Sequence, residues 1–133
     1  MSEQHKVKVA AALAAAAQRE AQHILDETGG AQAVVVATMD GFDIATALRA
    51  RIDPHRIAAL ASSIAAIGEV VSVEAKLGKA RSVTVDTDGG FAVVFSVARV
   101  DTPLVINVIA GPGALVGEVN YRAAAAARAL AAA

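Results

Sequence analysis

The spacing of apolar and polar positions along the chain predicts helices and strands in a mixed order. Residues 4–27 carry apolar side chains at helical spacing on one face, including Val7 and Leu13, with charged residues opposite. Two later segments show the same helical period, 54–77 and 114–132. Valine-rich or alternating segments predict strands at 33–39, 42–48, 81–86, 91–97 and 104–109. The elements therefore follow the order α-β-β-α-β-β-β-α.

Turn chemistry and strand polarity indicate how these strands are arranged. Asp40-Gly41 and Asp88-Gly89 are two-residue turns of the kind that joins antiparallel strands. The strands at 91–97 and 104–109 are apolar on both faces, which is typical of central strands covered by helices on both sides. The strand at 81–86 alternates valine with polar residues, so we expect it at an edge of the sheet. The pattern predicts an α+β fold, an α/β sandwich with helices on both faces of the sheet.

The helix at 54–77 carries the most information about assembly. Asp53 is a favoured N-cap residue, and Pro54 suits the first helical position. Two stripes run side by side along it, a large one at Ile57, Leu60, Ile64, Ile67 and Val71, and a small one at Ala58, Ala61, Ala65, Gly68, Ser72 and Ala75. We expect the large stripe to cover the sheet and the small stripe to pack on the same helix of a second copy, in a symmetric dimer. An alanine-rich composition also produces such small stripes by chance.

Composition and charge narrow the class of protein. The chain has 133 residues, no cysteine and a formal net charge of -1, so we expect one domain over 1–133, without disulfides or thiolate metal ligands. The balanced charge and an aromatic content of 3% argue against nucleic-acid binding.

Neither a secretion signal nor a membrane span is expected. Lys6 and Lys8 followed by residues 9–17 imitate a signal peptide, but Glu3 and the scarcity of large apolar residues there favour an alanine-rich helix. The longest uncharged run, 102–117, is shorter than the roughly 20 residues that a spanning helix needs, and proline and glycine interrupt it. We therefore expect a cytoplasmic protein that does not insert into a membrane.

Motifs that resemble catalytic or binding sites are each incomplete. The glycines within 111–117 follow a strand and open a helix, but their spacing and the short remaining chain do not fit a dinucleotide site. Asp86 and Asp88 lack the glutamate of a calcium loop, because Val97 stands at that position. The three histidines are scattered and pair with neither a metal ligand nor a nucleophile. The sequence therefore predicts no catalytic residue, no cofactor and no metal site.

Basic residues gather in two clusters near the two ends of the 54–77 helix, one at Arg49, Arg51 and Arg56 and the other at Lys76, Lys79 and Arg81. One interpretation is a solvated rim, which is the usual place of arginine and lysine. The other is a docking surface for an acidic partner or a nucleotide-bound protein. The candidate docking residues are Arg49, Arg51, Arg56 and Arg81.

Four segments in a fixed order carry one further signal. They are VVVATMDGF at 34–42, LASSIAAIGE at 60–69, VTVD at 83–86 leading into FAVV at 91–94, and LVINV at 104–108 before a glycine-containing final helix. In these residues the chain resembles the roadblock/LC7 family, over roughly residues 7–131. The resemblance lies in the order of the elements.

This resemblance implies a specific architecture. Family members have a five-stranded antiparallel sheet, with the middle helix on one face and the two terminal helices on the other. They dimerise through the middle helix and the third strand, which joins two sheets into one. Together with the small stripe, this assigns the dimer interface to Ala58, Ala61, Ala65, Gly68, Ser72, Ala75, Ser82 and Thr84.

The resemblance also implies a function. It suggests a homodimeric, non-enzymatic adaptor that regulates a small Ras-like GTPase, without a cofactor. The alanine-rich composition is typical of prokaryotic proteins, so a signalling role in prokaryotes fits better than a dynein light chain. A pure scaffold in a sensor-kinase or motility complex, with no effect on GTP turnover, is the alternative. A small-molecule sensory domain is a third interpretation.

Overall fold

The computed structural model describes residues 9–133 and contains the predicted elements in the predicted order. Their bounds are α1 (Ala11–Glu27), β1 (Ala31–Thr38), β2 (Asp43–Leu48), α2 (Pro54–Glu74), β3 (Ser82–Thr87), β4 (Gly90–Val97), β5 (Leu104–Ala110) and α3 (Val116–Ala132). The start predicted for the first helix, with Val7, lies outside the described residues. Strand ends differ from the predicted ones by about one or two residues, which is the usual uncertainty of element boundaries.

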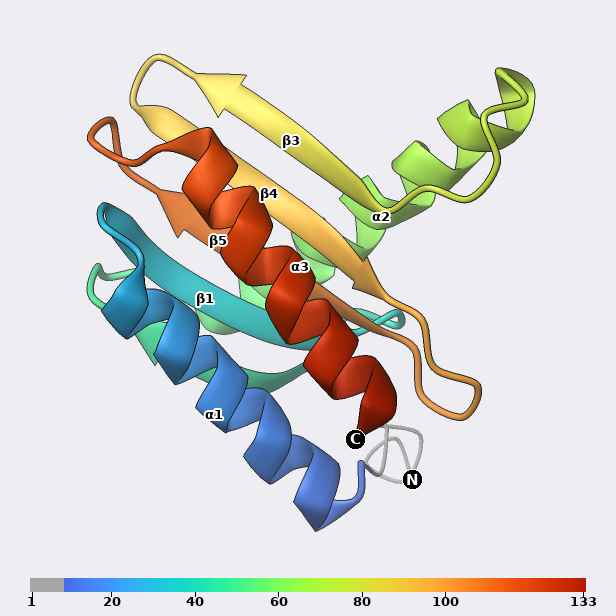
Figure 1. Cartoon of the computed structure of the whole chain (residues 1–133), viewed down its shortest axis with the longest axis horizontal. Helices are drawn as coiled ribbons and strands as arrows, with labels where there is room; N and C mark the ends of the chain where they lie inside the picture. The colour runs from blue at the N-terminus through green and yellow to red at the C-terminus, as the bar shows by residue number, and fades with distance from the viewer. Residues whose placement is uncertain (1–8) are drawn as a thin grey trace.

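The strands form one antiparallel sheet in the order β2-β1-β5-β4-β3. The strand predicted at an edge, β3, lies at an edge, and β4 and β5, apolar on both faces, lie inside the sheet. In Figure 1, α1 and α3 cover the near face and α2 crosses the far face. The predicted α+β fold and its division into layers are therefore confirmed.

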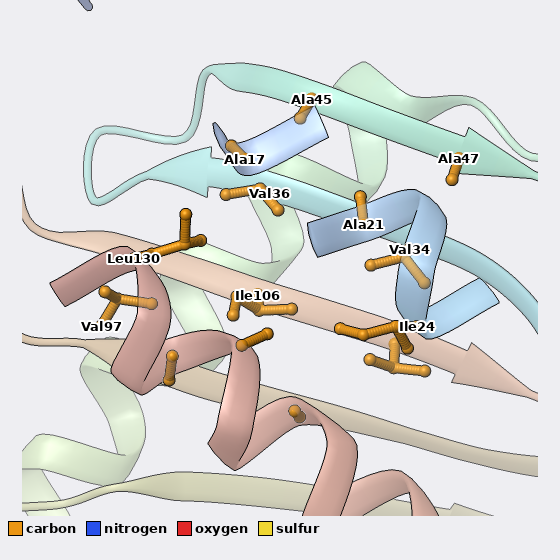
Figure 2. Close-up of a cluster of buried hydrophobic side chains, with 14 of the residues drawn as sticks. Ala17, Ala21, Ile24, Val34, Val36, Ala45, Ala47, Val97, Ile106 and Leu130 are labelled. Carbon is orange, nitrogen blue, oxygen red and sulfur yellow. The ribbon is translucent and has the colours of Figure 1, made fainter. Parts of the chain in front are cut away.

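The larger core fills the space between the sheet and the pair α1 and α3. Ala17 and Ala21 of α1 lie over β1 and β2, and their small side chains let that helix approach the strands closely (Figure 2). Leu130 of α3 packs beside Val97 and Ile106 in the same core. Alanine-rich helices therefore bury little side-chain area each, and the valine and isoleucine side chains of the strands supply most of the bulk.

On the opposite face, α2 packs its small side chains on the sheet. Ala58 and Ala61 are 0% exposed and belong to a second, smaller core with Val35 and Val105. Ala65 and Ser72 are buried on the same side of the helix. The prediction that the large stripe covers the sheet is therefore wrong.

The reason lies in the strands. They already present valine on the α2 face, so a helix with small residues there lies closer to the sheet and fills the space without voids. The large residues are consequently displaced outward: Ile57 and Ile64 are partly buried at the margin of this core, whereas Leu60 is 51% exposed and Ile67 is 63% exposed.

The end of α2 comes earlier than the predicted stop at Gly78. Lys76 adopts a left-handed φ of 57°. Its N–H donates to the Val73 carbonyl, and the Leu77 N–H donates to the Ser72 carbonyl at 2.8 Å. These two bonds are the Schellman pattern that closes a helix. The chain then turns back toward the start of β3.

Candidate interaction surface

The outward face of α2 exposes an unusual number of large apolar side chains. They are Leu60, Ile67, Val70, Val71, Val73 and, just past the helix, Leu77, each more than half exposed. Monomeric soluble proteins rarely expose such sets, so a patch of this kind marks an interaction site. Three of them, Leu60, Ile67 and Val71, belong to the large stripe that was expected to cover the sheet. We call these six residues the α2 patch.

By length and composition, α2 is also apolar enough to cross a membrane, with a mean hydropathy of 1.6 over its most apolar window. Arg56, Glu69 and Glu74 interrupt it, so it does not stand out as an uncharged run in the sequence. The same test is met by core helices of soluble proteins. Because α2 packs Ala58, Ala61 and Ala65 on its own sheet, we interpret its outward face as a protein-binding surface.

The outer edge of β3 lies next to the α2 patch. The Ser96 N–H donates to the Arg81 carbonyl at 2.9 Å, so the backbone groups of Arg81 point toward β4. In an antiparallel ladder this direction alternates, which turns the N–H and C=O groups of Ser82, Thr84 and Asp86 away from the sheet. Among residues 9–133, no hydrogen bond from another element reaches these groups. β3 is therefore an edge strand ready to pair.

A shallow hollow of about 450 Å³ joins these two features. It lies between the second half of α2 and β3, and its lining includes Ile67, Val71, Leu77 and Val83. Gly68 permits this close contact, because a Cβ atom there would lie 2.6 Å from Val83 Cγ2. In Figure 1 the end of α2 reaches past β3, beyond the edge of the sheet. The α2 patch and the β3 edge thus form one continuous candidate surface.

The predicted interface residues divide into two groups. Ala58, Ala61, Ala65 and Ser72 are buried against the sheet of their own chain and are not accessible to a second helix. Gly68 faces Val83 of the same chain. By contrast, Ala75, Ser82 and Thr84 are exposed and border the surface described above. The small stripe, except Ala75 at its end, is therefore corrected to a contact within the chain's own sheet.

Two polar contacts hold the start of α2. The Asp53 carboxylate accepts hydrogen bonds from the N–H groups of His55 and Arg56, as expected of an N-cap. His55 Nδ1 lies 2.6 Å from Asp43 Oδ1, which ties the helix to the first residue of β2. The helix is thus fixed over the β2 side of the sheet, and its far end projects beyond β3.

The structure separates the four candidate docking arginines. Arg49, Arg51 and Arg56 are exposed around the end of β2 and the first turn of α2. Arg81 precedes β3, at the opposite edge of the sheet. Arg49 also donates to the Ala31 carbonyl at 3.3 Å. The first three can form one basic rim, but Arg81 cannot belong to it within one chain.

The incomplete motifs have structural roles. Gly111 donates to the Gly30 carbonyl at 2.9 Å, and a Cβ atom on it would lie 2.6 Å from Gln32 Nε2. Asp88 and Gly89 form the turn between β3 and β4. Within residues 9–133, no group of three or more histidine, aspartate or glutamate side chains is arranged to hold a metal ion.

Comparisons with known proteins give a consistent result. The family model described as the Roadblock/LC7 domain matches residues 17–106. A solved Roadblock/LC7 domain from Streptomyces avermitilis is 18% identical, with a TM-score of 0.76 over 85% of this chain and 92% of that one. The gliding protein MglB from Thermus thermophilus is 20% identical, with a TM-score of 0.80 over 96% of this chain and 94% of that one.

A third structure, described as MglB with a tetrameric arrangement, is 21% identical, with a TM-score of 0.80 over 96% of this chain and 93% of that one. At these identities the structures establish the shared fold. A search of curated proteins found no match to this chain.

Proposed function

Because the chain belongs to the Roadblock/LC7 family, we propose that it is a homodimeric adaptor that binds and regulates a small Ras-like GTPase in prokaryotic signalling. In this proposal it carries out no chemistry of its own and acts in the cytoplasm. The observation that carries the dimer is the position of the α2 patch beside the open β3 edge. Two copies that cover this surface bury apolar area and satisfy the unpaired backbone groups together.

The sequence of β3 suits pairing with itself. If Thr84 lies opposite Thr84 of the second copy, Val83 lies opposite Val85 and Ser82 opposite Asp86. Each pair is compatible across antiparallel strands, since valines pack together and the serine hydroxyl can donate to a carboxylate. The arrangement is isologous, so the contact closes at two copies. This supports a dimer that extends the sheet across two chains.

The GTPase part of the proposal rests on the family and on the basic rim. Arg49, Arg51 and Arg56 have no acidic side chain within ion-pair distance among the described residues. Uncompensated arginines of this kind favour an acidic or phosphate-bearing partner and increase the rate of encounter. We therefore assign GTPase docking to this rim, and we assign Arg81 to the dimer edge.

The decisive experiment compares nucleotide states. The protein, fixed on beads, is exposed to native extract in which GTPases are loaded with GDP or with a non-hydrolysable GTP analogue. We expect a Ras-sized GTPase to be retained in one state preferentially, and its GTP turnover to change when this protein is added. Replacing all three rim arginines by alanine should weaken retention by about tenfold or more, whereas Arg128→Ala on α3 should not.

The alternatives give different results in this experiment. Equal retention of a partner in both nucleotide states, with unchanged GTP turnover, would favour the scaffold in a sensor-kinase or motility complex. Retention of no GTPase in either state would reject the regulator. A hollow of about 450 Å³ lined by Met39, Val97 and Leu104, with Lys79 and Arg81 beside it, gives the sensory interpretation a specific place to test. A metabolite bound there would raise the melting temperature.

A further inference from the structure

The opposite edge of the sheet is closed by a side chain. Gln18 of α1 lies beside β2, and its Nε2 donates to the Thr46 carbonyl at 2.8 Å. The Thr46 N–H donates back to Gln18 Oε1 at 3.1 Å. A side-chain amide thus makes the same pair of bonds that a residue of a neighbouring strand would make.

These bonds show which way the β2 backbone points. Thr46 stands opposite Val35 in the β1 pairing, yet its N–H and C=O are both directed to Gln18, away from β1. In an antiparallel strand this direction recurs at every second residue, so Leu48 shares it, whereas a β-bulge at Ile44 interrupts the alternation near the start of β2. The outer edge of β2 is therefore a strand-pairing surface, and Gln18 occupies its central position. The geometry of the two bonds is that of a peptide group in a sheet.

The sequence of β2 is self-complementary around this central position. If Thr46 lies opposite Thr46 of a second copy, Ala45 lies opposite Ala47 and Ile44 opposite Leu48. Threonine pairs and aliphatic pairs are favourable neighbours across antiparallel strands. No like charges meet in this register, because Asp43, the only charged residue of the strand, lies opposite Arg49 of the second copy. The occupant that fits this edge best is therefore a second copy of the same strand.

We propose that the outer edge of β2 is a second self-pairing surface of this protein and that Gln18 keeps it closed. An isologous contact at one edge gives a dimer, whereas isologous contacts at both edges give an open-ended ribbon. Gln18 thereby limits how many copies can join. This inference does not depend on a GTPase partner, and it holds whether or not β3 pairs as proposed above.

The test uses Gln18→Ala with Gln22→Ala as its matched control. Gln22 lies on the same helix and donates only to Asp26 on the surface. Gln18 is exposed, so its replacement leaves no cavity. We expect Gln18→Ala to raise the mass measured by light scattering at least about twofold, in a concentration-dependent way. Gln22→Ala should keep the wild-type mass.

Hydrogen exchange shows whether β2 is the contact. In dilute Gln18→Ala, the Thr46 amide should exchange faster than in the wild type, because its partner is gone. At high concentration it should become protected again as strands pair. Adding Thr46→Pro removes this outward N–H, so the double variant should return to the wild-type mass. A double variant that still assembles would overturn the proposal, as would Gln18→Ala with wild-type mass at all concentrations.

A further variant, Thr84→Pro, tests this inference independently of the proposed β3 dimer. Thr84→Pro removes an outward N–H at the other edge. In that background we expect Gln18→Ala to stop at two copies, joined through β2. If β3 does not pair in the wild type, the wild type is a monomer and Gln18→Ala still doubles its mass. The β3 dimer can therefore fail while the β2 inference stands, and the reverse also holds.

Discussion

The two edges of the sheet carry similar strands in different surroundings. β2 and β3 are each six residues long, and each has a central threonine whose backbone groups point away from the sheet. Thr46 of β2 binds Gln18, whereas among the described residues Thr84 of β3 has no such partner. What distinguishes the edges is the helix beside each one.

That difference teaches how one fold controls its own assembly. α1 runs along β2, and the side-chain amide of Gln18 binds the backbone of Thr46. These backbone groups are then not available to pair with another strand. α2 leaves the sheet beyond β3 and adds apolar side chains to an edge that is already unpaired. Whether an edge of the sheet is closed or open for pairing therefore depends on the helix that lies beside it.

The largest effect is expected from the α2 patch. Ile67→Glu with Val71→Glu places two carboxylates in the proposed contact, where they must be desolvated without a partner. We expect each to weaken dimerisation by about 2–4 kcal/mol, so that the double variant is monomeric at micromolar concentration. Both side chains are more than half exposed, so the monomer should stay folded. Light scattering and circular dichroism measure the two properties.

The matched control for that pair is Val100→Glu. Val100 is fully exposed in the loop between β4 and β5, so it tests the effect of added charge alone. A wild-type protein that is already monomeric would remove the basis of the α2 and β3 dimer. A double glutamate variant that remains dimeric would move the contact to another surface.

A pair of proline variants compares the edges directly. Thr84→Pro deletes an outward N–H of the open edge and should weaken dimerisation by about 10- to 100-fold, since it also disturbs the neighbouring strand bonds. Thr46→Pro deletes the corresponding N–H of the closed edge, which binds only Gln18, and should leave the dimer unchanged. Sedimentation equilibrium gives both dissociation constants. Equal loss of dimer in the two variants would contradict the assignment of the contact to β3.

The fold could be predicted because its signals are local. The two-residue turn at Asp88-Gly89 and the apolar faces of residues 91–97 needed no knowledge of distant contacts, and both were confirmed. The candidate interaction surface was harder to predict from the sequence. Spacing located both stripes of α2, but it does not say which stripe faces the sheet. That choice depends on the bulk of the opposite strands, which only the tertiary arrangement reveals.

Gln18 had no signal of its own in the sequence. It is one polar residue at the margin of the apolar face of α1, and its role appears only when β2 lies beside it. Gly68 is similar, because its spacing suggested contact with a second copy, whereas it lies against Val83 of its own β3. Residues whose role comes from a single distant partner are the ones that periodicity misses.

A smaller effect is expected where α2 meets β3. Gly68→Leu forces its side chain into Val83 and should lower the free energy of unfolding by about 1–3 kcal/mol through overpacking. Val83→Ala in the same chain should recover part of this loss, because it vacates the space. Chemical denaturation of the single and double variants measures the coupling. Additive losses would show that Gly68 and Val83 do not share this contact.

The smallest effect separates stability from assembly. Asn107 lies in β5, between the two halves of the sheet; it is 3% exposed, and its Oδ1 has no hydrogen-bond partner within residues 9–133. Asn107→Val removes an unsatisfied polar atom and adds apolar contacts with its neighbours Val35 and Val94, so it should raise the free energy of unfolding by about 1 kcal/mol. Neither edge is touched, so the number of copies should stay that of the wild type. If urea denaturation showed a loss of stability instead, Asn107 would have a partner that completes its hydrogen bonds. If the mass changed, the edges would respond to the centre of the sheet and could not be treated as independent.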